Sequence, residues 1–124
     1  MKLLVIDDNP DFAESMRALL QIRGYDVRCY FSGQDFLRQV HTVSDEDVII
    51  TDYYLPDLNG IELVKRARAQ RPRVAAILLT GSRENGIAKA ARDVADCKVE
   101  YKPLDYESLE RSIRQVSSAR SGRH

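Results

Sequence analysis

The amino-acid sequence predicts an α/β protein, in which helices cover both faces of a doubly wound, five-stranded parallel sheet. Two patterns support this fold class. Short apolar runs rich in branched residues alternate five times with segments of helical character, and four of these runs end directly on polar residues. Such alternation favours right-handed crossovers, and open sheets of this kind bind ligands beyond the carboxyl ends of their strands.

The first two strand–helix pairs lie in the amino-terminal part of the chain. Residues Lys2–Ile6 form a continuous apolar run, as expected for a central strand covered on both faces. Asn9 and Pro10 suit the cap and the first turn of a helix, and an apolar stripe at helical spacing follows them. We expect a second strand at Tyr25–Phe31 and a short helix capped by Ser32.

The middle of the chain repeats this pattern. After a polar connection at His41–Glu46, a third strand is expected at Asp47–Thr51. Turn-forming residues at 56–60 precede a third helix, which we expect to end at Pro72. The apolar run Val74–Thr80 predicts a fourth strand.

The carboxyl-terminal part contains the weakest helical signal. A loop is expected at Gly81–Gly86, before a fourth helix whose apolar face is weak. Lys98–Tyr101 predicts a brief fifth strand, and Asp105 precedes a last amphipathic helix. We expect one domain at residues 1–118 and a frayed tail or linker at 119–124, where apolar periodicity is absent.

Composition excludes several classes of function. Nineteen acidic and nineteen basic residues balance to a net charge of zero, so we expect neither direct nucleic-acid binding nor attachment to a membrane surface. Cys29 and Cys97 form no CxxC motif or disulfide framework, which favours a reducing compartment. The first apolar run breaks at Asp7, too early for a secretory signal, so a soluble, cytoplasmic domain is expected.

Five polar residues stand at the carboxyl ends of four predicted strands: Asp7, Asp8, Asp52, Thr80 and Lys102. In a parallel sheet these ends meet at one edge, so the side chains are expected to converge. Three neighbouring carboxylates repel one another unless a cation is present. An all-oxygen site with room for water suits Mg²⁺, which usually binds together with phosphate oxygens.

The same residues predict phosphoryl transfer. An aspartate carboxylate can act as the nucleophile and form an aspartyl-phosphate, and Asp52 is the best-placed candidate. Mg²⁺, the Lys102 ammonium and the Thr80 hydroxyl would stabilise the charge of the phosphoryl group. Taken singly, each residue has an ordinary explanation as a turn residue, a strand former or a solvated charge. Their joint placement favours the chemical interpretation.

The sequence blocks that carry these residues resemble the receiver domain of two-component response regulators. The blocks are LLVIDDN, ITDYYLPDLNGIEL, ILLTG and EYKPLD, in this order and over nearly the whole chain. The resemblance implies a CheY-like, flavodoxin-like fold with strand order 2-1-3-4-5. It also implies that Asp52 accepts a phosphoryl group from a phosphohistidine on a sensor histidine kinase or a phosphotransfer protein.

The resemblance assigns further roles. Asp8, Asp52 and the main-chain carbonyl of Tyr54 would hold Mg²⁺, and Asp7 would act mostly through water. Phosphorylation would change the face formed by the fourth helix, fifth strand and fifth helix, which regulates a partner, a dimer partner or an attached output domain. The chain is then a switch with slow autodephosphorylation and not a turnover enzyme.

The chain departs from the family pattern at several positions. Val99 occupies the place of the usual switch aromatic, and Tyr101 would face away from Lys102 on a strand, so the role is not transferred to it. Tyr54 and Ser82 occupy positions that influence phosphate loss in the family. The bulk of Tyr54 predicts a longer-lived phosphoryl group.

Two other functions remain open. An adaptor that works without phosphate is compatible with Val99 at the switch position. A Mg²⁺-dependent phosphatase also uses an aspartate nucleophile on a doubly wound sheet. That class usually carries a DxDxT pattern on its first strand, and the segment IDDNPD does not match it. The phosphorylation-activated switch is the favoured hypothesis.

Overall fold

The computed structural model describes residues 1–81 and 85–121, and over these residues the chain alternates five strands with five α-helices. The strands are β1 (Lys2–Ile6), β2 (Asp26–Tyr30), β3 (Val48–Asp52), β4 (Ala75–Thr80) and β5 (Cys97–Tyr101). The helices are α1 (Pro10–Ile22), α2 (Gly33–Arg38), α3 (Gly60–Arg68), α4 (Asn85–Arg92) and α5 (Tyr106–Ser121), and a 3-10 turn, Val40–Thr42, follows α2. None of the helices in the described ranges is long and apolar enough to cross a membrane.

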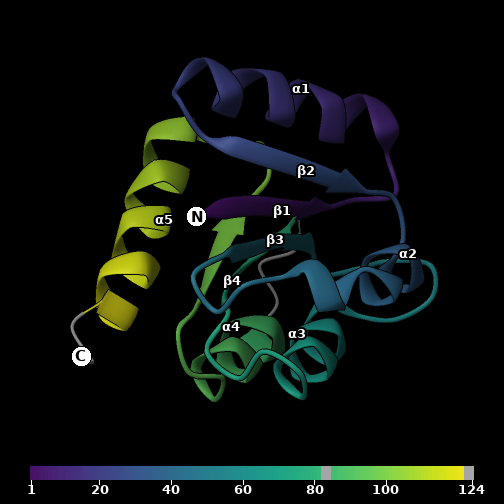
Figure 1. Cartoon of the computed structure of the whole chain (residues 1–124). Helices are drawn as coiled ribbons and strands as arrows, with labels where there is room; N and C mark the ends of the chain where they lie inside the picture. The colour runs from purple at the N-terminus through teal and green to yellow at the C-terminus, as the bar shows by residue number, and fades with distance from the viewer. Residues whose placement is uncertain (82–84, 122–124) are drawn as a thin grey trace.

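The five strands form one parallel sheet in the order β2-β1-β3-β4-β5 (Figure 1). This confirms the predicted fold class and strand order. All strands run in the same direction, so their carboxyl ends share one edge of the sheet. The order changes direction between β1 and β3, and in open α/β sheets such a switch point is where ligands bind.

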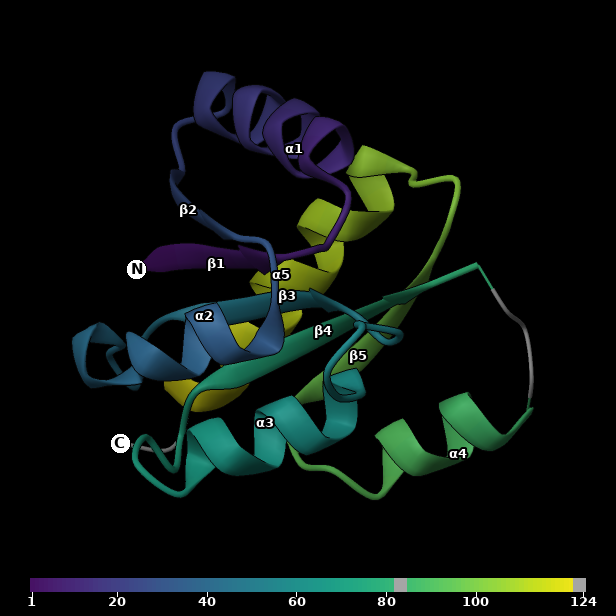
Figure 2. The same cartoon turned by 90° about the vertical axis from the view of Figure 1, so that its right-hand side faces the viewer.

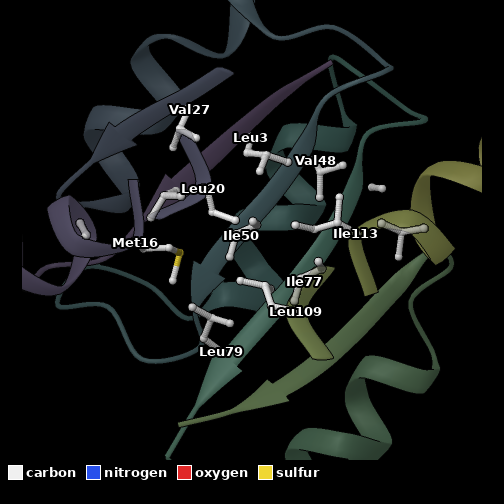
Figure 3. Packing of buried hydrophobic residues seen from close by; sticks show 14 residues of the cluster. Leu3, Met16, Leu20, Val27, Val48, Ile50, Ile77, Leu79, Leu109 and Ile113 are labelled. Atoms are coloured by element: carbon white, nitrogen blue, oxygen red, sulfur yellow. The ribbon is translucent and has the colours of Figure 1, made fainter. Parts of the chain in front are cut away.

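Helices cover both faces of the sheet (Figure 2). On the face of α1 and α5, fourteen buried side chains form one apolar cluster, drawn in Figure 3. The helical members of this first cluster are Ala13, Met16, Leu20, Leu109, Ile113 and Val116. A second cluster packs α2, α3 and α4 against the opposite face, with Phe36, Leu63, Val64, Ala67 and Ala91 from the helices. Burial on both faces explains the continuous apolar runs of β1, β3 and β4.

Side-chain caps fix where several helices begin. The carboxamide oxygen of Asn9 accepts hydrogen bonds from the first turn of α1, as the sequence predicts. The Ser32 hydroxyl caps α2 in the same way, and Asn59 caps α3. Pro10 occupies the first position of α1, where its missing N–H costs nothing.

Some element boundaries differ from the predicted ones. Helix α4 begins at Asn85, inside the segment predicted as a loop, and buries Ile87 on its short apolar stripe. Helix α3 ends at Arg68, before Pro72. A turn separates the helix from the proline, and the N–H of Arg71 donates to the carbonyl oxygen of Ala67 across this turn. Helix α5 extends to Ser121, while residues 122–124 of the predicted tail lie outside the described part of the chain.

Candidate functional site

The two adjacent aspartates after β1 lie in different environments. The N–H of Asp7 donates to the carbonyl oxygen of Tyr30 at 3.1 Å, which extends the β1–β2 pairing by one residue. The residue Asp7 is only 1% exposed, whereas Asp8 is exposed at the lip of the site. The chain leaves the sheet between them, and this turn allows both carboxylates to reach the same edge.

Asp52 is the last residue of β3, and the loop that follows it is closely tied to the sheet. One carboxylate oxygen of Asp52, Oδ1, accepts a hydrogen bond from the N–H of Tyr54 at 3.2 Å. The N–H of Tyr53 donates to Leu79 in β4 at 2.8 Å, and its carbonyl oxygen accepts from the N–H of Gly60 at 2.7 Å. These bonds leave Oδ2 of Asp52 directed toward the other residues of the edge.

Thr80 and Lys102 follow from the neighbouring strands. Thr80 is the last residue of β4, is fully buried, and pairs in register with Tyr101 of β5. The N–H of Lys102 donates to the carbonyl oxygen of Thr80 at 2.9 Å. This bond continues the β4–β5 ladder and fixes the point from which the lysine side chain leaves the sheet.

The Lys102 ammonium bridges two of the carboxylates. Its Nζ atom lies 3.0 Å from Oδ2 of Asp52 and 3.2 Å from Oδ2 of Asp7. Carboxylate oxygens of Asp7, Asp8 and Asp52 all lie within 4.8 Å of one another. Three aspartates and one lysine, from three different strand ends, therefore converge on one site.

Burial and neighbouring charges have opposite effects on the pKa values of Asp7 and Lys102. Burial raises the pKa of the Asp7 carboxyl, and the hydrogen bond from Asn9 and the charge of Lys102 offset only part of that effect. For Lys102, burial alone would lower the pKa, but the hydrogen bond and charge of Asp52, with the charge of Asp7, raise it above its usual range. The lysine therefore stays protonated, and its single charge balances only part of the negative charge of the three carboxylates.

The donor set fits a small hard cation. The acidic group offers three carboxylates, and the exposure of Asp8 leaves one side open to water. Mg²⁺ prefers such a combination of one or two carboxylates with several waters. The peptide of Tyr54 lies beside Asp52 through its N–H, and the metal-ligand role of its carbonyl stays a prediction.

The residues that depart from the family pattern occupy distinct places. Val99 is half-buried and packs against the second cluster, on the side of α4. Tyr101, two residues further along β5, points to the same side as Val99 because side chains alternate along a strand. Tyr54 is 54% exposed, and its ring packs edge-to-face on that of Tyr53 with 4.8 Å between the ring centroids. Ser82 lies outside the described residues.

Two residues at the site, and one in the loop that follows Asp52, make contacts that the sequence did not predict. Phe12 places its ring under the Lys102 ammonium, 4.3 Å from its centroid, although its spacing indicates only a core position. Asn9, predicted as a helix cap, also donates its N–H to Asp7 at 2.9 Å. Asp57, predicted as a turn residue, accepts hydrogen bonds from the first turn of α2.

The fold and the group of three aspartates and one lysine together define a CheY-like α/β domain. The chain belongs to the family of the response regulator receiver domain, whose sequence profile matches residues 3–114. The family consists of signalling domains of two-component systems.

Curated relatives support the same assignment. The transcriptional regulatory protein DltR of Streptococcus agalactiae is 32% identical over 119 residues, which cover 92% of this chain and 50% of DltR. The transcriptional regulatory protein FixJ of Bradyrhizobium diazoefficiens is 30% identical, with coverage of 94% and 58%. ZraR of Salmonella typhimurium is 27% identical, with coverage of 92% and 26%. The chain thus spans about a quarter to three fifths of the length of these regulators.

Solved structures agree with the fold. A response regulator receiver domain from Clostridium thermocellum superposes with a TM-score of 0.87 at 27% identity, covering 97% of this chain and 96% of that one. The chemotaxis response regulator CheY4 of Vibrio cholerae gives a TM-score of 0.81 at 26% identity, with coverage of 93% and 97%.

Proposed function

We propose that this domain is a phosphorylation-activated switch in which Asp52 accepts a phosphoryl group. One observation carries the proposal: the Lys102 ammonium lies 3.0 Å from Oδ2 of Asp52 within a group of three carboxylates. A purely structural ion pair does not require two further carboxylates beside it, since they repel one another. A site that binds a divalent cation and, through it, a dianionic phosphoryl group does require them.

The reaction is a transfer between two nucleophiles. A carboxylate oxygen of Asp52 attacks phosphorus, and the P–N bond to the imidazole of a donor phosphohistidine breaks, so that nitrogen keeps the electron pair and takes up a proton. The product is an aspartyl-phosphate. The donor is a sensor histidine kinase or a phosphotransfer protein, which fits membership of the two-component family.

The other residues of the site stabilise the charge of the transferred group. Asp8 and Asp52, with the carbonyl of Tyr54, would hold Mg²⁺, while the buried Asp7 acts mostly through water. Lys102 and the hydroxyl of Thr80 would contact phosphoryl oxygens. When bound, Mg²⁺ neutralises charge on these oxygens; the protein contributes the preformed geometry of the edge.

Phosphorylation changes the face formed by α4, β5 and α5, and a partner binds there. A groove of about 450 Å³ runs between α4 and β5, lined by small apolar side chains such as Ala88, Ala91 and Val99 and flanked by Arg92 and Lys98. We propose that an output domain, a second copy or another protein partner binds this face. The two free thiols of the chain fit a cytoplasmic location.

Labelling with a small phosphodonor tests the proposal. The purified chain is incubated with Mg²⁺ and acetyl phosphate, and its intact mass is followed. We expect the parent chain and Asp26→Asn, a control on the exposed edge of β2, to gain one hydroxylamine-sensitive phosphoryl group. Asp52→Asn should gain none. Equal labelling of Asp52→Asn would show that another residue is the nucleophile.

A phosphate-independent adaptor is the second candidate, and the packing of Val99 favours it. Val99 supplies no aromatic ring at this position, although Tyr101 lies on the same side of β5. Mg²⁺ with beryllium fluoride, a mimic of aspartyl-phosphate, separates the two functions. A switch should show amide NMR shifts at Thr80 and along β5, whereas an adaptor should show none there.

A further inference from the structure

The Lys102 ammonium has a third neighbour besides its two carboxylates. Its Nζ atom lies 4.3 Å from the centroid of the Phe12 ring, within the range of a cation–π interaction. Phe12 belongs to the first turn of α1 and is half-buried against the first apolar cluster. The ammonium is therefore held between two negative groups and one aromatic face.

The aromatic face differs from the carboxylates in what else it can bind. Asp7 and Asp52 both belong to the acidic group suited to a cation, and Asp52 is the proposed phosphoryl acceptor. A carboxylate that shares its charge with another cation, or that is esterified, attracts the lysine less. The Phe12 ring binds neither a hard cation nor a phosphoryl group, so its attraction for the ammonium persists through these changes.

The position of the ring is fixed relative to the acidic group. The carboxamide oxygen of Asn9 accepts from the N–H of Phe12 at 3.3 Å and from that of Asp11 at 3.1 Å. The N–H of Asn9 in turn donates to Oδ1 of Asp7 at 2.9 Å. One residue thus links the backbone of Phe12 to the carboxylate that bonds Lys102 through its other oxygen.

We propose that Phe12 is a positioning residue that keeps the Lys102 ammonium directed at the phosphoacceptor Asp52. The inference rests on the proposed function and adds to it a residue that touches no substrate. Its contribution reaches the reaction only through the lysine. Loss of the aromatic face should therefore slow phosphoryl transfer without abolishing it.

Substitutions that separate ring chemistry from packing test this role. Phe12→Leu keeps an apolar side chain but removes the π face, and Phe12→Tyr keeps both. Tyr25→Leu is the matched control, because Tyr25 is a half-buried aromatic residue on the same cluster. With Mg²⁺ and acetyl phosphate, we expect Phe12→Leu to label about two- to fivefold more slowly. Phe12→Tyr and Tyr25→Leu should stay close to the parent rate.

A structural readout accompanies the rates. Protons on the ε-carbon of Lys102 should show an upfield ring-current shift in NMR spectra of the parent and Phe12→Tyr. The shift should disappear in Phe12→Leu and persist in the parent after addition of Mg²⁺ and beryllium fluoride. Phe12→Met, which also lacks the ring but has a more adaptable side chain, replaces Phe12→Leu if that variant loses its helical circular dichroism.

The outcomes distinguish this role from the proposed function. If the parent chain gains no phosphoryl group on Asp52, the proposed function fails, and the positioning role fails with it. If the parent is labelled but Phe12→Leu labels at the same rate, or the Lys102 shift is unchanged, only the role of Phe12 is overturned. Equal slowing in Tyr25→Leu would also overturn it, because general loss of packing would then explain the effect.

Discussion

The first residue of α3, Gly60, passes so close to the end of β3 that a Cβ atom on it would lie 3.0 Å from the carbonyl oxygen of Asp52. The same atom would lie 3.2 Å from Cα of Tyr53 and 2.9 Å from a methyl group of Leu78. Two of these three neighbours are backbone atoms that cannot turn aside. The absence of a side chain at Gly60 therefore allows α3 to start directly beside Asp52, the proposed phosphoacceptor.

Replacement of this glycine should destabilise the domain. In Gly60→Ala the backbone around Asp52 must shift, and overpacking of this kind costs about 1–3 kcal/mol in the free energy of unfolding. Gly86→Ala is the control, since a Cβ there meets nothing within 4 Å and Gly86 lies in α4. We expect it to be neutral or up to about 1 kcal/mol more stable. Urea denaturation measures both, and similar values for the two variants would contradict the close-approach argument.

Asp57 should stabilise the loop that follows Asp52. Its carboxylate accepts hydrogen bonds from the N–H groups of Gly33 at 3.2 Å and Gln34 at 2.8 Å, in the first turn of α2. Asp57→Ala leaves both donors without this acceptor, and loss of such a cap costs about 0.5–2 kcal/mol. Chemical denaturation should show the loss, with local hydrogen exchange increased at residues 33–35.

An exposed aspartate provides the comparison for this variant. The side chain of Asp26, in β2, forms a surface ion pair with Arg28 at 3.4 Å. Asp26→Ala should change stability by less than about 0.5 kcal/mol, because solvent screens such pairs. If the two substitutions have equal effects, the contact between the loop and α2 is not a significant source of stability.

The fold could be predicted from the sequence because its signals are local and repeated. Continuous apolar runs in β1, β3 and β4 indicate strands buried on both faces, and caps such as Asn9 mark helix starts. Helix α4 was placed less well. Its buried stripe contains few residues, Ile87 and Ala91 among them, so the apolar periodicity does not define where the helix begins.

The site was predicted in part for a different reason. Asp7, Asp52 and Lys102 stand at the carboxyl ends of β1, β3 and β5. Because all strands of the sheet are parallel, these ends share one edge, where the three side chains meet. Contacts that depend on side-chain direction leave no such signal. The ring of Phe12 beneath Lys102 and the reach of Asp57 to α2 result from packing across sequence separations that no spacing rule describes.

The raised pKa of Asp7 makes the stability of the fold depend on pH, and linkage between protonation and folding gives the sign of this dependence. Because Asp7 is buried, its carboxyl group binds a proton more tightly in the folded state than in the unfolded chain, where its pKa is 3.8. The resulting stability is complete below that value and is lost as the pH rises through the folded pKa. With a chelator present, Asp7→Asn should therefore be more stable than the parent near about pH 7, and the advantage should vanish near about pH 3. A variant less stable than the parent at neutral pH would contradict this.

Mg²⁺ should make the parent more stable than Asp7→Asn, the reverse of the order expected with a chelator. Binding to the folded state alone adds about 2.7 kcal/mol when the free ion is at a hundred times its dissociation constant. The parent, with all three carboxylates of the acidic group, should gain more from Mg²⁺ than Asp7→Asn. Thermal unfolding with and without the ion measures the two increments, and Ca²⁺ at equal concentration tests the preference for the smaller ion.

The thiol of Cys97 should react slowly despite the absence of a disulfide. Burial between α4 and β5 raises its pKa from 9.0 to about 11, and the charge of Arg68 offsets only part of this effect. Two pKa units lower the thiolate fraction about a hundredfold, and the thiolate is the species that reacts. In a Cys29→Ser background, iodoacetamide at about pH 8 should modify the native protein roughly a hundredfold more slowly than the urea-unfolded chain. The native rate should rise with pH beyond the point where the unfolded rate levels off; equal rates in both states would show that the thiol is not shielded.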